Sequence, residues 1–182
     1  MTPKKPQGEG FPLALLGMVL VQEVPRSPTQ FDLISIVPSN TEIPSKEHRE
    51  NITARFSDLI SAIESHKSWT PPNVDRSLFH VWDFVKRSHY IMTELDNMVA
   101  GRPLKHPDQI PKNDGTSTGP AAAAASFHDV LTRTIMINQS IQDPRMLVMM
   151  GMSNADFGPA IKEKSVAVMK ALTDSTENQP SS

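Results

Sequence analysis

The sequence predicts a mainly α-helical protein, built as a bundle of four main helices with an N-terminal β-hairpin or extended arm. Apolar residues recur three and four positions apart over four separate segments, and this spacing puts them on one face of a helix. Serine, aspartate, glycine and proline stand at the ends of these segments, where such residues cap or stop helices. Segments that resemble strands are short and lie near the N-terminus.

The longest pattern runs from Asp75 to Gly101 and predicts the central helix. Asp75 has a carboxylate that caps free amides of a first turn, and Gly101 favours a left-handed end before Pro103. The apolar face comprises Leu78, Val81, Val85, Ser88, Met92, Leu95 and Val99, with a second row of Phe84, Ile91 and Met98. The opposite, polar face comprises Arg76, His80, Asp83, Arg87, Tyr90, Glu94 and Asn97.

Three further helices are expected around it. The first begins near Ser45 and carries His66 and Lys67 in its last turn, where positive charge suits the helix dipole. The second begins at Pro120 and stops at Asp143-Pro144, and the third begins at Pro159. Their apolar faces are, in order, Ile52, Phe56, Leu59, Ile60 and Ile63; Phe127, Val130, Leu131, Ile135 and Ile141; and Ile161, Val168, Met169 and Leu172.

The remaining segments set the domain limits. Residues 1–10 are expected to be flexible, residues 11–174 to form one mainly helical domain, and residues 175–182 to be a disordered tail. The apolar run 11–21, extended to 24, is compatible with a strand, a helix or the core of a signal peptide, and as a helix it is too short to span a bilayer. With Phe31 to Val37 it would form the hairpin. Residues 102–119 are expected to be a long loop.

Composition and motifs point away from catalysis. The chain has 182 residues, 16 prolines, a net charge of -2 and no cysteine, which excludes disulfides and thiolate chemistry. Residues 115–119 match G-x-S-x-G, but no buried strand precedes them as that nucleophile motif requires. His80 and His89 lie on different sides of one helix and cannot share a metal ion. We therefore expect no catalytic residue, no cofactor and no metal site.

The segment Arg145 to Met152 holds the most informative candidate residues. It is short, apolar and rich in methionine, and its pattern favours a short helix. Methionine fills irregular gaps in a core, and it also suits a surface that must adapt to a partner. Both interpretations stay open. The candidate interface residues are Met146, Met149, Met150, Met152 and Phe157.

The long loop holds the second set of candidates. Arg102, Lys105 and Lys112 are basic and stand in a segment with few apolar residues, so they are candidates for weak contacts with phosphate. Asp108 and Asp114 nearly balance this charge, which favours an ordinary solvated loop. Nucleic acid is therefore the second class of partner, after another protein chain.

These observations favour a non-enzymatic structural, assembly or adaptor protein that acts through self-association or protein–protein contacts. A cysteine-free helical bundle of this size with a long polar loop is similar in outline to the coat proteins of helical RNA viruses, a likeness of fold that carries no residues over. A coat protein that packages nucleic acid is thus one alternative, and a secreted helical-bundle signalling protein is another. A cytoplasmic or virion-associated location is favoured over secretion.

Overall fold

The structure, a computed structural model, describes residues 42–110, 117–152 and 155–177. Four long helices and one short helix make up most of these residues. They are α3 (Lys46–Glu64), α4 (Arg76–Ala100), α5 (Pro120–Gln142), α6 (Arg145–Met149) and α7 (Gly158–Glu177), with a 3-10 turn at Pro107–Gln109. The predicted helical bundle is confirmed, whereas the predicted N-terminal hairpin or arm lies outside the described residues.

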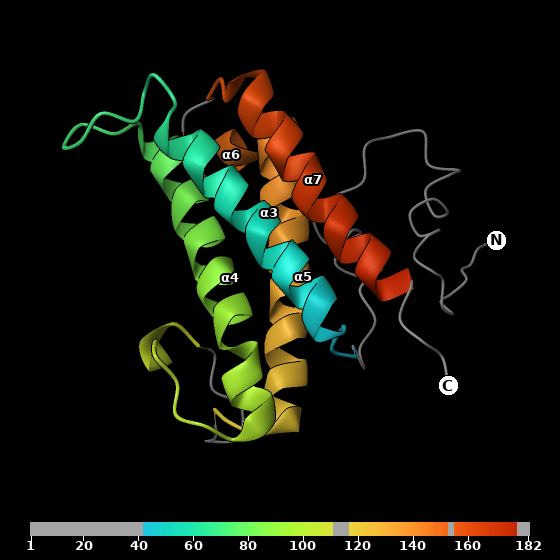
Figure 1. The fold of residues 1–182 in the computed structure, drawn as a ribbon. Helices are drawn as coiled ribbons and strands as arrows, with labels where there is room; N and C mark the ends of the chain where they lie inside the picture. Colours follow the sequence, from blue (N-terminus) through green and yellow to red (C-terminus); the bar gives the residue numbers. More distant parts are fainter. Residues whose placement is uncertain (1–41, 111–116, 153–154, 178–182) are drawn as a thin grey trace.

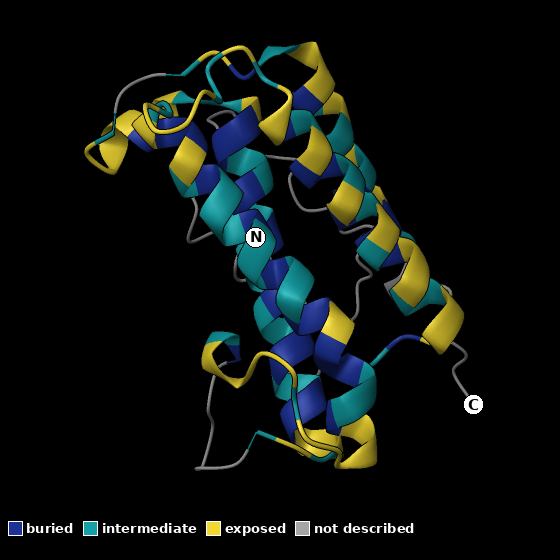
Figure 2. Ribbon diagram, turned by 60° about the vertical axis from the view of Figure 1, so that its left-hand side comes forward, coloured by how far each residue is buried: buried dark blue, intermediate teal, exposed yellow. Residues whose placement is uncertain are grey.

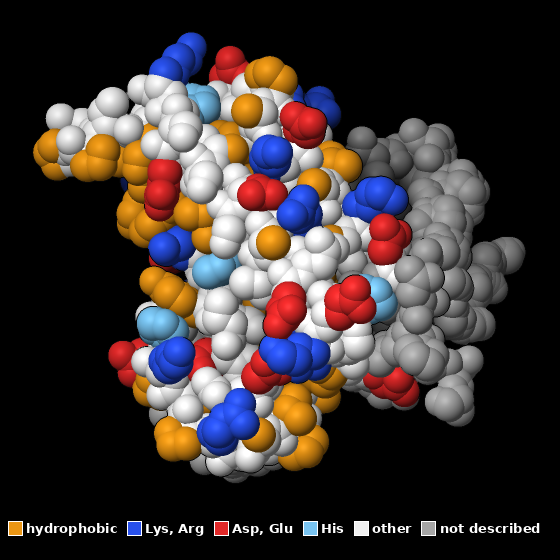
Figure 3. All heavy atoms as spheres, in the orientation of Figure 1, with side chains coloured by type: hydrophobic (Ala, Val, Ile, Leu, Met, Phe, Trp, Pro, Cys, Tyr) orange, Lys and Arg blue, Asp and Glu red, His pale blue; other side chains and the backbone are white. Residues whose placement is uncertain are grey.

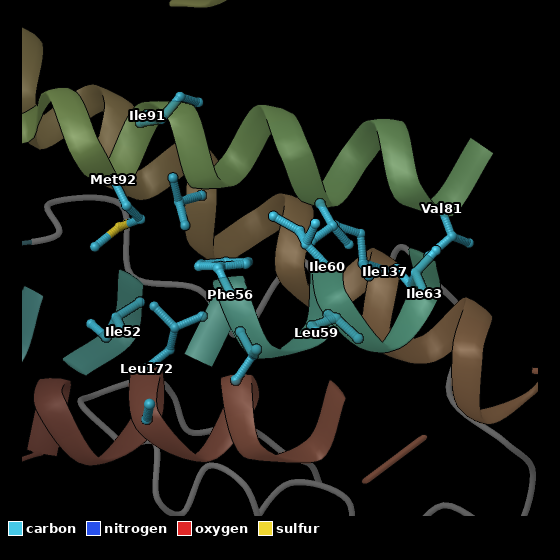
Figure 4. Close-up of a cluster of buried hydrophobic side chains, with 14 of the residues drawn as sticks. Ile52, Phe56, Leu59, Ile60, Ile63, Val81, Ile91, Met92, Ile137 and Leu172 are labelled. Carbon is cyan, nitrogen blue, oxygen red and sulfur yellow. The ribbon is translucent and has the colours of Figure 1, made fainter. Parts of the chain in front are cut away.

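The long helices close into a ring in which α3 packs on α4, α4 on α5, α5 on α7 and α7 on α3 (Figure 1). Successive long helices run in opposite directions, as short connections require. Buried residues face the inside of the ring, and exposed residues lie on the outer sides and at the ends (Figure 2). The five apolar residues predicted for α3 are all buried, and Figure 4 shows them between α4 and α7.

Capping residues start and stop the helices where the sequence predicts. The Ser45 side chain accepts a hydrogen bond from the amide of His48, and Asp75 accepts one from the amide of Leu78 at 2.9 Å. Gly101 ends α4 with φ of 72°, a left-handed conformation that glycine adopts without strain. Pro120 occupies the first turn of α5, where its missing N–H costs nothing.

Three end effects differ from the prediction. Helix α3 ends at Glu64, so His66 and Lys67 lie beyond its last turn. Val99 is 41% exposed, because the last turn of α4 extends past the start of α3 and has no helix to pack on (Figure 1). Helix α7 continues to Glu177, into the segment that composition alone predicts to be disordered.

Glu94 is the clearest correction on α4. The helical pattern places it on the polar face, yet it is 1% exposed. Its carboxylate accepts hydrogen bonds from the Asn97 side chain at 2.8 Å and from the backbone amide of His106. Asn97 in turn accepts from Arg102 at 3.1 Å. This network fastens residues 102–110 to α4, and Ile110 is buried beyond it. The first half of the expected loop is therefore ordered.

Polar contacts on the outer side of the bundle join α3 to α4. Asp96 pairs with Arg49 and Lys46; burial opposes ionisation, but hydrogen bonds from these two cations hold the pKa of Asp96 below its usual value. The His89 imidazole lies 3.1 Å from the Ser57 hydroxyl. Burial lowers the pKa of His89, and the charge of Lys86 lowers it further. Folding therefore favours the neutral imidazole at this position.

Candidate functional site: the exposed surface of α6

Helix α6 is short but firmly held at both ends. Before it, the Asp143 carboxylate accepts two hydrogen bonds from the Arg145 guanidinium, at 2.9 and 3.0 Å. After it, Gly151 adopts φ of 84° and donates to the carbonyl of Val148, while Met152 donates to the carbonyl of Leu147. This pair of bonds is a Schellman motif, which satisfies the last carbonyls of a helix. A five-residue helix is thereby kept in one conformation.

One side chain of α6 anchors it to the bundle and three side chains face outward. Leu147 is completely buried in the core. Val148, Met149 and Met150 are 50%, 80% and 42% exposed, and we call these three residues the α6 surface. Among the residues that the structure describes, the other large exposed apolar side chains are Phe79, Val99 and Val166, and none of these is next to another in sequence.

The candidate interface residues separate into two groups. Met149 and Met150 are exposed, so the core interpretation of the methionine cluster is wrong for these two. Met152 is partly buried against the core, and Met146 is also partly buried. Phe157 is 1% exposed and belongs to the core, because α7 begins directly after it and turns its ring inward. Phe157 therefore cannot contribute to an exposed surface in this conformation.

The α6 surface lies at the end of the bundle where α3 joins α4 (Figure 1). His66, in that connection, donates from Nε2 to the carbonyl of Asp156 at 3.0 Å and accepts at Nδ1 from the amide of Ser68. The Asp156 carboxylate accepts from the amide of Gly158 at the start of α7. These bonds tie the α3–α4 connection to the segment just beyond α6, so this end of the bundle is a fixed platform.

No protein-family model, curated protein or solved structure matches this chain. The geometry of its own residues therefore carries the argument about function.

The described residues offer no metal site and no membrane span. No group of three histidine, aspartate or glutamate side chains within ranges 42–110, 117–152 and 155–177 is arranged to hold a metal ion. None of the helices in those ranges has both the length and the apolar character needed to cross a bilayer. The polar cluster on α4 is an ion pair, in which Arg87 lies 4.0 Å from Asp83, with His80 packed on the ring of Phe84.

The candidate phosphate contacts are only partly brought together. Arg102 and Lys105 are exposed in the ordered segment 102–110, and the Arg102 Nε is already bonded to Asn97. Lys112 lies outside the described residues. The sequence gave no reason to place the 102–110 segment beside Tyr90, although the ring of His106 lies 4.6 Å from that of Tyr90. The missing signal was Glu94, a charged residue whose burial depends on a turn twelve residues away.

Proposed function

We propose that this protein is a non-enzymatic assembly or adaptor protein, and that the α6 surface is the place where another protein chain docks. The observation that carries the proposal is the run Val148-Met149-Met150, three consecutive apolar side chains held outward on a helix that is anchored by Leu147. Contiguous apolar surface on a folded domain usually marks a contact with another molecule.

Energetics support an interface centred on these residues. Burying a valine or methionine side chain gains about 1.5–3 kcal/mol relative to leaving it in water. Three such side chains supply the kind of central cluster that dominates many interfaces, although a stable interface buries about 800 Å² on each partner. The rest of the area would come from neighbouring surface at the same end of the bundle. Methionine also adjusts its shape to a partner at low cost.

A second copy of this chain is the partner that we favour. Most self-associating proteins form two-fold dimers, in which the same patch meets itself. The α6 surface is uncharged and apolar, so it is complementary to its own copy without any change of sign. The flanking Asp143 and Arg145 are paired with each other and add no net charge beside it. An adaptor role, with a different protein in that place, uses the same three residues.

The test is the double change Met149→Ser with Met150→Ser. Because both side chains are exposed, we expect helicity and melting temperature to stay close to those of the parent protein, while the mass measured by light scattering falls toward one chain. Val166→Ser is the matched control, since Val166 is an exposed apolar residue on α7. It should leave the mass unchanged. Loss of helicity in the double variant, or an unchanged mass, would contradict the proposal.

A further inference from the structure

A second feature lies on the outer face of α4. Phe79, Trp82, Lys86 and Tyr90 are spaced three and four positions apart, so they share one face of the helix. Trp69, from the α3–α4 connection, adds a ring at one end, and His106, from the ordered loop, adds one at the other. These six residues form what we call the aromatic row. In Figure 3, hydrophobic side chains alternate with basic ones down this left-hand margin of the molecule.

The rings of the aromatic row are close enough to act together. Ring centroids lie 5.1 Å apart for Trp69 and Trp82, 5.4 Å for Phe79 and Trp82, and 4.6 Å for Tyr90 and His106. The Lys86 ammonium lies 5.5 Å from the centre of the Trp82 ring and 5.5 Å from that of Tyr90. One cation is thus held between two aromatic faces, where cation–π attraction fixes it.

Hydrogen bonds hold the row in place. The Trp82 indole N–H donates to the Glu64 carboxylate at 2.8 Å. The backbone amide of Trp69 donates to the carbonyl of His66 at 2.9 Å. His106 is fixed through its amide by the buried carboxylate of Glu94. A ligand that stacked on these rings would therefore order few side chains, which keeps the entropic cost of binding low.

The charges around the row favour an anion. Lys86 forms no ion pair with any carboxylate in the described part of the chain. The nearby acids have partners already: Asp83 faces Arg87, Glu64 accepts from Trp82, and Asp75 caps α4.

At the foot of the row, two exposed cations, Arg102 and Lys105, outnumber the single exposed acid of that segment, Asp108. The alternation of ring and cation along the row thus comes with a local positive surplus.

From this arrangement we propose that the aromatic row binds single-stranded nucleic acid, with bases stacked on Trp82 and Tyr90 and the intervening phosphate on Lys86. Aromatic rings in a basic track are the usual means by which proteins hold single strands without sequence preference. Phe79 and Tyr90 are eleven residues apart, which is about 16 Å along a helix. At about 3.4 Å per nucleotide, that length matches four or five nucleotides.

Both tryptophans of the chain, Trp69 and Trp82, belong to the row, so intrinsic fluorescence reports on it alone. The probe is a short adenylate oligonucleotide, titrated into the full chain at several salt concentrations, with inorganic polyphosphate as an anion that has no bases. We expect saturable quenching by the oligonucleotide and little or none by polyphosphate. Binding of both anions without a change in tryptophan fluorescence would overturn the proposal, and so would no binding at all.

Variants separate stacking from charge. Tyr90→Ala should weaken binding at least about fivefold, whereas Tyr90→Phe, which keeps the ring, should bind like the parent protein. Lys86→Gln should lower the slope of log affinity against log salt by about 0.7, the share of one phosphate on a single strand. Lys170→Gln is the matched control, since Lys170 is an exposed lysine on α7, which does not pack on α4.

Circular dichroism confirms that each variant is folded. Equal loss from Lys86→Gln and Lys170→Gln would mean that binding is general and not located in the row. Fluorescence that changes with protein concentration, and not with the oligonucleotide, would mean that a protein chain covers the row instead. Either result overturns the proposal without touching the α6 surface, which lies on different residues.

Discussion

Val85→Asp is expected to unfold the bundle, with a loss of more than about 4 kcal/mol in the free energy of unfolding. Val85 is completely buried on the inner face of α4, the helix that packs on both α3 and α5. Aspartate at this position would remove apolar contacts and place a carboxylate where no water or cation reaches it. Since typical domains are stable by about 5–15 kcal/mol, one such change removes much of that total.

Asp83→Ala is the control for that experiment. Asp83 is two residues away, on the outer side, and its side chain is 47% exposed with Arg87 at 4.0 Å. An exposed pair of this kind contributes less than about 1 kcal/mol. Urea unfolding followed by circular dichroism measures both variants. Similar losses from the two changes would mean that α4 is rotated relative to the arrangement described above.

Glu94→Ala is expected to have the second largest effect, about 1–3 kcal/mol of lost stability. The change would leave two buried donors without an acceptor, the amide of His106 and the side chain of Asn97. It would also release residues 102–110 from α4. We therefore expect trypsin to cut after Lys105 faster in the variant than in the parent protein, at a rate measured by mass spectrometry of the fragments.

Two further variants grade this result. Glu94→Gln keeps one carbonyl acceptor and should fall between the parent protein and the alanine variant. Glu163→Ala removes an exposed glutamate from α7 and should change stability by no more than about 0.5 kcal/mol. If cleavage after Lys105 were equally fast in all three variants and the parent protein, Glu94 would not be what fastens the loop.

The helices were predictable because their signals are local. The spacing of Ile52, Phe56 and Ile63 determines which face of α3 is buried, and the caps at Ser45 and Asp75 depend on residues within one turn. Pro120 and Gly101 act through their own backbone conformations. None of these features needs knowledge of a distant segment, so one sequence suffices to find them.

The functional surfaces were harder to predict because they depend on contacts between distant segments. Glu94 has the spacing of an exposed residue, and only the return of the chain at His106 buries it. The methionines of α6 are alike in sequence, yet the position of α6 on the bundle leaves Met149 exposed and packs Met152 against the core. Phe157 was expected at the interface for its proximity in sequence, but the start of α7 turns it inward.

The central claim is that two copies of this chain meet through α6, and disulfide cross-linking of Met149→Cys tests it most directly. The chain has no cysteine of its own, so the new thiol can pair only with its copy on another chain. Under mild oxidation we expect a covalent dimer of Met149→Cys on a non-reducing gel. Val166→Cys, equally free to react on α7, should stay a single chain. Cross-linking of the two variants to the same extent, or of neither, would contradict the account.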